Sequence, residues 1–89
     1  MKTIQFSVRG RVQGVGFRMY TRSVAEQLQL TGWVRNERDG SVSGQAQGPT
    51  AALEEFLEQI GRGPTRSRVD ELTHSECGPS AFADFTIRR

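Results

Sequence analysis

Apolar and polar residues alternate at the beginning of the chain. Ile4, Phe6 and Val8 are separated by polar side chains, and this period of two predicts a strand with one buried face that ends near Arg11. Residues 10–16 follow with three glycines, which allow conformations and close approaches that side chains would block. The sequence therefore predicts a strand followed by a tight loop.

The apolar spacing then changes to three and four, which is the period of a helix with one buried face. One helix is predicted to begin at Phe17 and to end before Gly32. A second helix follows Gly48-Pro49-Thr50, with Gly61 placed to end it. The apolar positions of the two predicted helices are Phe17, Tyr20, Val24, Ala25 and Leu28, and Leu53, Phe56, Leu57 and Ile60.

Four further strands are predicted from short apolar runs bounded by turn residues. Residues 30–36 and 41–47 form a pair joined at Asp39-Gly40, a dipeptide typical of hairpin turns. A weaker strand is predicted near residues 68–74, and Phe85 and Ile87 mark a last one.

This order predicts the α+β class, as a ferredoxin-like split βαβ sandwich of plan β-α-β-β-α-β plus a short extra strand. Two helices are expected to cover one face of an antiparallel sheet. In this plan strand three lies between parallel strands one and two, so the ends of those two strands meet at one edge. A length of 89 residues allows one modest core, and we expect a single domain over residues 1–89.

Composition narrows the class of protein. No segment approaches the roughly 20 apolar residues that cross a bilayer, and the N-terminus lacks the apolar run of a secretory signal, so we expect a cytoplasmic protein without a membrane partner. Cys77 and His74 are the only residues of their types. Together they cannot form a four-ligand zinc site, and neither has a sequence neighbour that indicates a nucleophile.

Basic side chains are concentrated in the N-terminal part. Residues 1–40 carry seven basic and three acidic side chains, whereas residues 41–89 carry five and seven. This distribution favours an anionic ligand near the N-terminal half, although a merely basic surface would also produce it.

The junction from Gln13 to Arg18 is the strongest candidate for a binding site. Backbone N–H groups at a helix N-terminus are unpaired and lie at the positive end of the helix dipole, so they bind anions. A cation such as Arg18 is mildly unfavourable there, and an anion that bridges the guanidinium and the N–H groups would explain it. A solvated Arg beside a structural turn is the alternative. Met19 replaces the third glycine of a dinucleotide fingerprint, and no Walker motif follows.

Asn36, at the end of the predicted strand 30–36, is the second candidate. Its amide both donates and accepts hydrogen bonds and could orient a water molecule, although Asn at such a position is most often a turn residue. Because strands one and two end at the same edge, Arg18 and Asn36 can face one ligand.

Several motifs of the chain resemble those of the acylphosphatase family. The resemblance is carried by Gly10-Arg11-Val12-Gln13-Gly14-Val15-Gly16-Phe17-Arg18 and Gly32-Trp33-Val34-Arg35-Asn36, with Asp39-Gly40-Ser41-Val42, Gln47-Gly48-Pro49 and Phe85-Thr86-Ile87-Arg88 in support. It implies that Arg18 binds a phosphate and that Asn36 holds the attacking water. The backbone that it implies as the phosphate cradle belongs to Gln13, Gly14, Val15, Gly16 and Phe17.

The resemblance further implies a metal-independent enzyme that hydrolyses the carboxyl–phosphate bond of acyl phosphates without a cofactor. The expected ligands are a small-molecule acyl phosphate and inorganic phosphate, the latter as product and inhibitor. The sequence shows no apolar surface stripe, so a monomer is expected. Glu37 places a negative charge beside Asn36, where it could slightly repel phosphate.

Two other functions stay open. RNA-binding modules share the βαββαβ plan, but Phe6 is predicted to face the core and residues 41–47 contain no aromatic side chain, so no nucleic acid partner is expected. The other is a phosphate-binding module without turnover, since small displacements of catalytic groups abolish catalysis.

Overall fold

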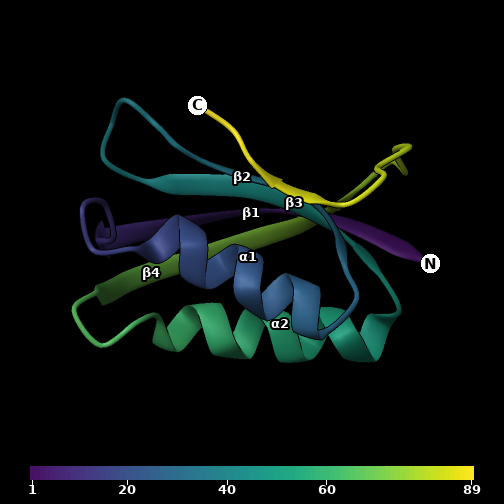
Figure 1. Cartoon of the computed structure of the whole chain (residues 1–89), viewed down its shortest axis with the longest axis horizontal. Helices are drawn as coiled ribbons and strands as arrows, with labels where there is room; N and C mark the ends of the chain where they lie inside the picture. Colours follow the sequence, from purple (N-terminus) through teal and green to yellow (C-terminus); the bar gives the residue numbers. More distant parts are fainter.

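The computed structural model describes residues 1–89 and contains five strands and two helices. In chain order they are β1 (Lys2–Arg11), α1 (Phe17–Gln27), β2 (Thr31–Asn36), β3 (Val42–Gly48), α2 (Thr50–Arg62), β4 (Arg68–Cys77) and β5 (Phe85–Ile87). Both helices cover the same face of the sheet (Figure 1). The predicted element order and the ferredoxin-like α+β fold are confirmed.

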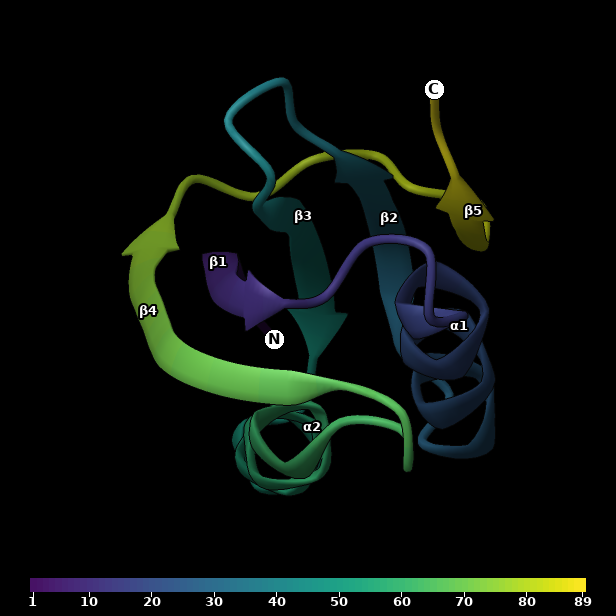
Figure 2. The same cartoon turned by 90° about the vertical axis from the view of Figure 1, so that its left-hand side faces the viewer.

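The strands form one sheet in the order β4-β1-β3-β2-β5. β3 pairs antiparallel with both β1 and β2, so β1 and β2 run in the same direction on either side of it, as predicted. The expectation of a wholly antiparallel sheet was wrong, because β5 pairs parallel with β2. After β4 the chain crosses to the opposite edge and turns back (Figure 2). Because the chain turns back, β5 runs antiparallel to β4. Since β4 is itself antiparallel to β1, β5 is parallel to β1 and β2.

The core lies between the sheet and the helices. Alternation in β1 places Ile4, Phe6 and Val8 on the helix side, where each is at most 4% exposed. Phe6 meets Phe56 of α2 edge-on, with ring centroids 5.3 Å apart, and such aromatic pairs contribute about 0.5–1.5 kcal/mol beyond area burial. Phe6 therefore faces the core, as the sequence predicted.

The helix ends differ from prediction at one position. α1 begins at Phe17, as expected, but α2 continues through Gly61 and ends after Arg62. The residue that ends it is Gly63, whose φ of 70° lies in the left-handed region. A residue with a Cβ is disfavoured there, so this position favours glycine.

The loop after β1 and the hairpin after β2 lie at the same end of the molecule (Figures 1 and 2). In the hairpin, the N–H of Glu37 donates to the Ser41 carbonyl at 2.8 Å and the N–H of Gly40 to the Glu37 carbonyl at 3.2 Å. This confirms the predicted turn and brings the two candidate segments to one edge. None of the helices has the length and apolar character needed to span a membrane.

Candidate active site

The glycine loop leaves its backbone donors free. Gly14 and Gly16 have φ values of 74° and 79°, so the chain turns through the left-handed region twice before α1 begins. No hydrogen bond within the chain is donated by the backbone N–H groups from Gln13 to Met19. The helix has neither a side-chain cap nor an acidic residue in its first turn. Seven consecutive free donors at the positive end of a helix dipole form an anion-binding site.

Arg18 lies in the first turn of α1 and is half-buried. Its guanidinium makes no ion pair with any carboxylate of the chain, unlike those of Arg9, Arg35, Arg62 and Arg68. Arg18 lines a hollow of about 360 Å³ together with Gly14, Gly16, Phe17 and Asn36. The structure thus places Arg18 and Asn36 at one hollow, as expected from the meeting strand ends.

Asn36 is the last residue of β2 and lies opposite Val42 of β3. Since Val42 and Val34 are fully buried, the alternation of the strand directs the Asn36 side chain to the helix side, toward the hollow. Its Oδ1 is buried and has no hydrogen-bond partner in the chain. Leaving such a group unpaired costs about 1–3 kcal/mol, so the fold holds this amide at the hollow at a cost in stability.

Gln13 contributes differently from the other loop residues. Its side-chain Nε2 donates to the backbone carbonyls of Glu37 and Ser41, at 2.8 and 2.9 Å. These two bonds connect the glycine loop to the hairpin that follows Asn36. Val15 packs as a half-buried residue against the core, and neither Gln13 nor Val15 lines the hollow, so the loop meets the hollow through Gly14, Gly16, Phe17 and Arg18.

Glu37 lies beside Asn36 in sequence but its carboxylate turns to the other face of the sheet. It accepts hydrogen bonds from Arg35 Nε at 2.8 Å and from the Ser43 hydroxyl. These bonds, first that from Arg35 and then that from Ser43, lower the pKa of Glu37. The negative charge is therefore compensated on the open face, away from the hollow that holds Asn36.

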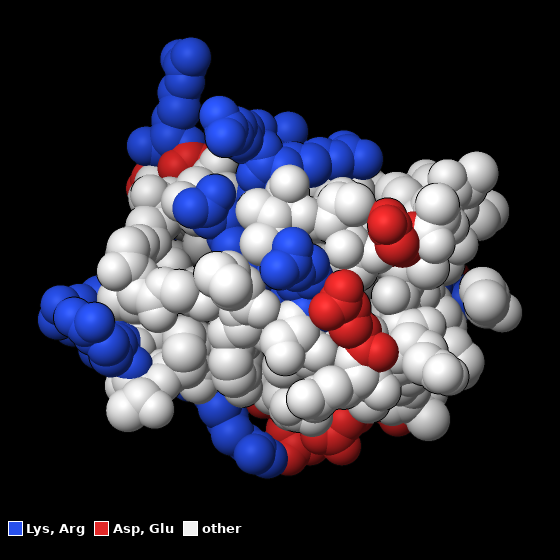
Figure 3. Space-filling view, viewed as in Figure 1, with Lys and Arg blue, Asp and Glu red and all other residues white.

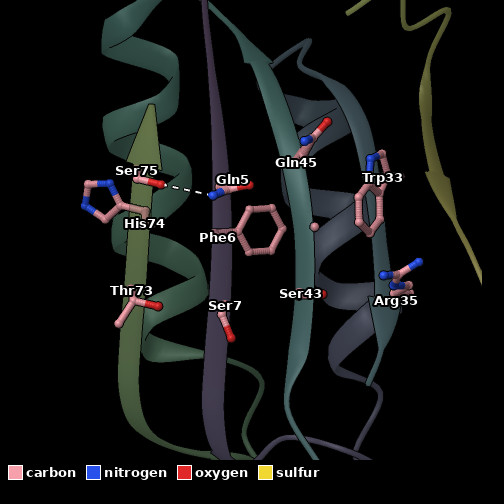
Figure 4. Close-up of a pocket in the computed structure, with 11 residues that line it drawn as sticks. Gln5, Phe6, Ser7, Trp33, Arg35, Ser43, Gln45, Thr73, His74 and Ser75 are labelled. Carbon is pink, nitrogen blue, oxygen red and sulfur yellow. Dashed lines mark hydrogen bonds between the residues drawn. The ribbon is translucent and has the colours of Figure 1, made fainter. Parts of the chain in front are cut away.

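A larger hollow of about 560 Å³ lies on the open face of the sheet (Figure 4). Its lining side chains are mostly uncharged and polar, as in the pair Gln5–Ser75, whose atoms Nε2 and Oγ are 3.3 Å apart. Its one arginine, Arg35, is already paired with Glu37. The residues that line this hollow therefore include no arginine or lysine free of an ion pair, and no run of free backbone donors comparable to the glycine loop.

The same face does not favour an RNA-binding module. RNA-recognition sheets stack bases on several aromatic side chains of the central strands, whereas the central strands contribute only Trp33 to this hollow outside the core, and the other non-core ring is His74 on the edge strand β4. The guanidinium carbons of Arg35 and Arg88 already lie 5.0 and 4.6 Å from the Trp33 ring centroid.

The remaining polar candidates lie apart from the hollow that Arg18 and Asn36 line. His74 is exposed on the edge strand β4, and Cys77 is half-buried at the end of the same strand. The chain brings together no group of three or more His, Cys, Asp or Glu side chains that could hold a metal ion.

Four residues of the hollow were missed by the sequence analysis. They are the buried Val12 before the loop, and Met19, Ile87 and Arg89, which line the hollow beside Arg18. One feature of the sequence pointed to Met19, which is an apolar residue that does not lie on the buried face of its helix. The place of Ile87 and Arg89 depends on β5 joining the sheet beside β2, which the sequence pattern did not predict.

The charge distribution agrees with an anionic ligand at this end. Basic side chains gather over the hairpin and the C-terminal strand, and acidic side chains lie over α2 (Figure 3). The acidic residues of α2 are exposed. Charge of one sign near a site raises the local concentration of the opposite ion.

Comparisons with known proteins agree along the whole chain. A family model described as Acylphosphatase matches residues 4–87. An acylphosphatase of Salinibacter ruber is 48% identical over 90 residues, covering 99% of this chain and 94% of the relative. Acylphosphatase-1 of Gallus gallus is 45% identical, with 100% and 94% covered. The crystal structure of acylphosphatase from Bacillus subtilis has a TM-score of 0.97 at 37% identity, with both chains fully covered.

Proposed function

The chain belongs to the acylphosphatase family and hydrolyses acyl phosphates, and we propose that the Gln13–Arg18 loop holds the phosphate while Asn36 orients the attacking water. The observation that carries these roles is the single hollow where free N–H groups, an unpaired guanidinium and an unpaired amide converge.

Phosphate binding is assigned to the backbone donors and to Arg18. The planar guanidinium can donate two parallel hydrogen bonds to two phosphate oxygens, while loop N–H groups donate to the others. Phosphoryl transfer depends mainly on positioning and on stabilisation of charge around the phosphorus. Both effects are available here from the protein's own donors, and the mechanism therefore needs no metal ion.

Water activation is assigned to Asn36 and the substrate together. The amide accepts a hydrogen bond from the water and fixes its direction of attack on phosphorus. As the new P–O bond forms, the bond from phosphorus to the carboxyl oxygen breaks and its electron pair leaves with the carboxylate. An amide cannot remove a proton at neutral pH, so a phosphate oxygen of the substrate accepts one water proton. The products are a carboxylate and inorganic phosphate.

The first test is the hydrolysis of benzoyl phosphate by the parent chain, with and without excess chelator, and by Arg18 variants. Arg18→Ala is expected to abolish turnover and competitive inhibition by phosphate together. Arg18→Lys should also lose turnover, because a single ammonium cannot donate the two parallel hydrogen bonds of a planar guanidinium. Arg22→Ala, on the same helix but outside the hollow, is the matched control and should retain turnover.

Retained phosphate inhibition in Arg18→Ala would refute the binding role. Loss of turnover with chelator would refute the metal-independent mechanism. No turnover in the parent chain would support a phosphate-binding module without catalysis.

We further propose that the enzyme acts as a monomer in the cytoplasm and that product phosphate competes with substrate for the loop. The competition is expected because the product phosphate and the phosphate group of the substrate are assigned to the same hydrogen-bond donors. Sedimentation of the purified chain tests the monomer, inhibition kinetics with phosphate test the competition, and fractionation of cells that express the chain tests the location.

A further inference from the structure

The hollow that Arg18 and Asn36 line is larger than a phosphate group requires. Its volume of about 360 Å³ falls in the range of sites for small organic ligands. Beyond the loop and Asn36, the hollow continues along Met19, Ile87 and Arg89. A second part of the substrate can therefore lie beside the phosphate.

Met19 is exposed in a way that other apolar side chains of this chain are not. It is 63% exposed, and the only other large hydrophobic side chain classed as exposed is the N-terminal Met1. Met19 directly follows Arg18 in the first turn of α1. An unbranched, polarizable thioether adapts to ligands of varied shape, and Met19 lines the hollow beside the phosphate donors.

Ile87 approaches the same hollow from another element. It lies on β5, paired in register with Val34 of β2, and is half-buried against the edge of the core. Because α1 and β5 pack against each other, Met19 and Ile87 present an apolar wall next to the phosphate donors. Arg89 adds a positive charge to the rim, which disfavours cationic ligands.

We propose that Met19 and Ile87 bind the acyl substituent of the substrate, and that the enzyme prefers acyl phosphates with an apolar body, aromatic rings included, over acetyl phosphate. This rests on the proposed placement of the phosphate on the Gln13–Arg18 loop. A phosphate held there directs its acyl oxygen out of the cradle, and the residue adjacent to Arg18 is within reach of the attached group.

The test compares benzoyl phosphate with acetyl phosphate in the parent chain and in two Met19 variants. Met19→Gln keeps the length of the side chain but makes it polar, and it is expected to lower kcat/KM for benzoyl phosphate about three- to tenfold, mainly through KM. The value for acetyl phosphate should change less than about twofold, since a methyl group buries little area. Met19→Leu restores an apolar surface and should recover most of the benzoyl phosphate activity.

Equal losses for both substrates in Met19→Gln would overturn the proposal, because they would place the effect on the shared phosphate. Unchanged kinetics for both substrates would overturn it as well. Acetyl phosphate turnover and its loss in Arg18→Ala are measured in the same assay. A chain that keeps this Arg18 dependence but shows no selective Met19 effect retains the proposed mechanism and loses only the acyl contact.

Discussion

At the scale of single residues, Asn36 can be separated from phosphate binding. Its side chain reaches the hollow from β2, whereas the phosphate donors belong to the loop and α1. Asn36→Ala is therefore expected to lower kcat about 100-fold or more, because water orientation acts on the transition state. The inhibition constant for phosphate should stay nearly unchanged. Steady-state kinetics with benzoyl phosphate and added phosphate measure both quantities.

Two outcomes would contradict this role of Asn36. Near-normal kcat would show that the amide is structural, and a parallel loss of phosphate inhibition would show that it acts on binding. Circular dichroism of the variant controls for folding, since removing an amide whose Oδ1 is buried and unpaired should not destabilise the chain.

At the scale of elements, the side chain of Gln13 couples the loop to the hairpin. Its two hydrogen bonds to backbone carbonyls contribute about 0.5–1.5 kcal/mol each. Gln13→Met keeps the shape but has no donor, so we expect the free energy of unfolding to fall by about 1–3 kcal/mol. A shift of loop against hairpin misplaces Arg18 relative to Asn36, and kcat is expected to fall about tenfold.

Gln45→Met is the matched control for Gln13. Gln45 lies on the open face of the sheet, away from the hollow that Arg18 and Asn36 line, and donates no hydrogen bond to the backbone. Urea unfolding and benzoyl phosphate kinetics of both variants test the coupling. Equal effects in the two variants, or normal kcat in Gln13→Met, would show that the loop keeps its position without this contact.

Most elements could be predicted because their buried faces follow simple periods. Ile4, Phe6 and Val8 show the period of two in β1, and Asp39-Gly40 marks the turn that the structure contains. The end of α2 was misplaced, since Gly61 and Gly63 are equivalent by composition and only the backbone conformation separates them.

The candidate site was predictable only in part for a similar reason. Sequence motifs indicated the loop, Arg18 and Asn36, because glycine spacing and helix periodicity are local properties. The direction of the Gln13 side chain and the place of Ile87 depend on contacts over 24 or more residues along the chain and on the pairing of β5. No local pattern encodes such contacts.

At the scale of the whole molecule, carboxylates with hydrogen-bond partners relate stability to pH. Hydrogen bonds lower the pKa values of three carboxylates. The largest cause for Asp39 is the bond from the Ser41 hydroxyl, that for Asp70 is the bond from Arg68, and that for Glu37 is the bond from Arg35. A folded pKa below the unfolded value contributes stability that is fully present above the unfolded value, ordinarily 3.8 for Asp and 4.5 for Glu. That stability is lost as pH falls through the folded pKa.

Asp39 offers the clearest test of this relation, because its carboxylate accepts two bonds from Ser41, at 2.6 and 2.9 Å, and pairs with Arg9 at 3.2 Å. Asp39→Asn keeps an oxygen for Ser41 but removes the ionisable group. The variant should be somewhat less stable than the parent near pH 7, and it should lose less stability on acidification to about pH 3. Asp84→Asn is the control, since the Asp84 carboxylate forms no ion pair, and should follow the parent. Urea unfolding midpoints across this range measure the difference; an Asp39→Asn curve parallel to that of the parent would place the acid sensitivity in other carboxylates.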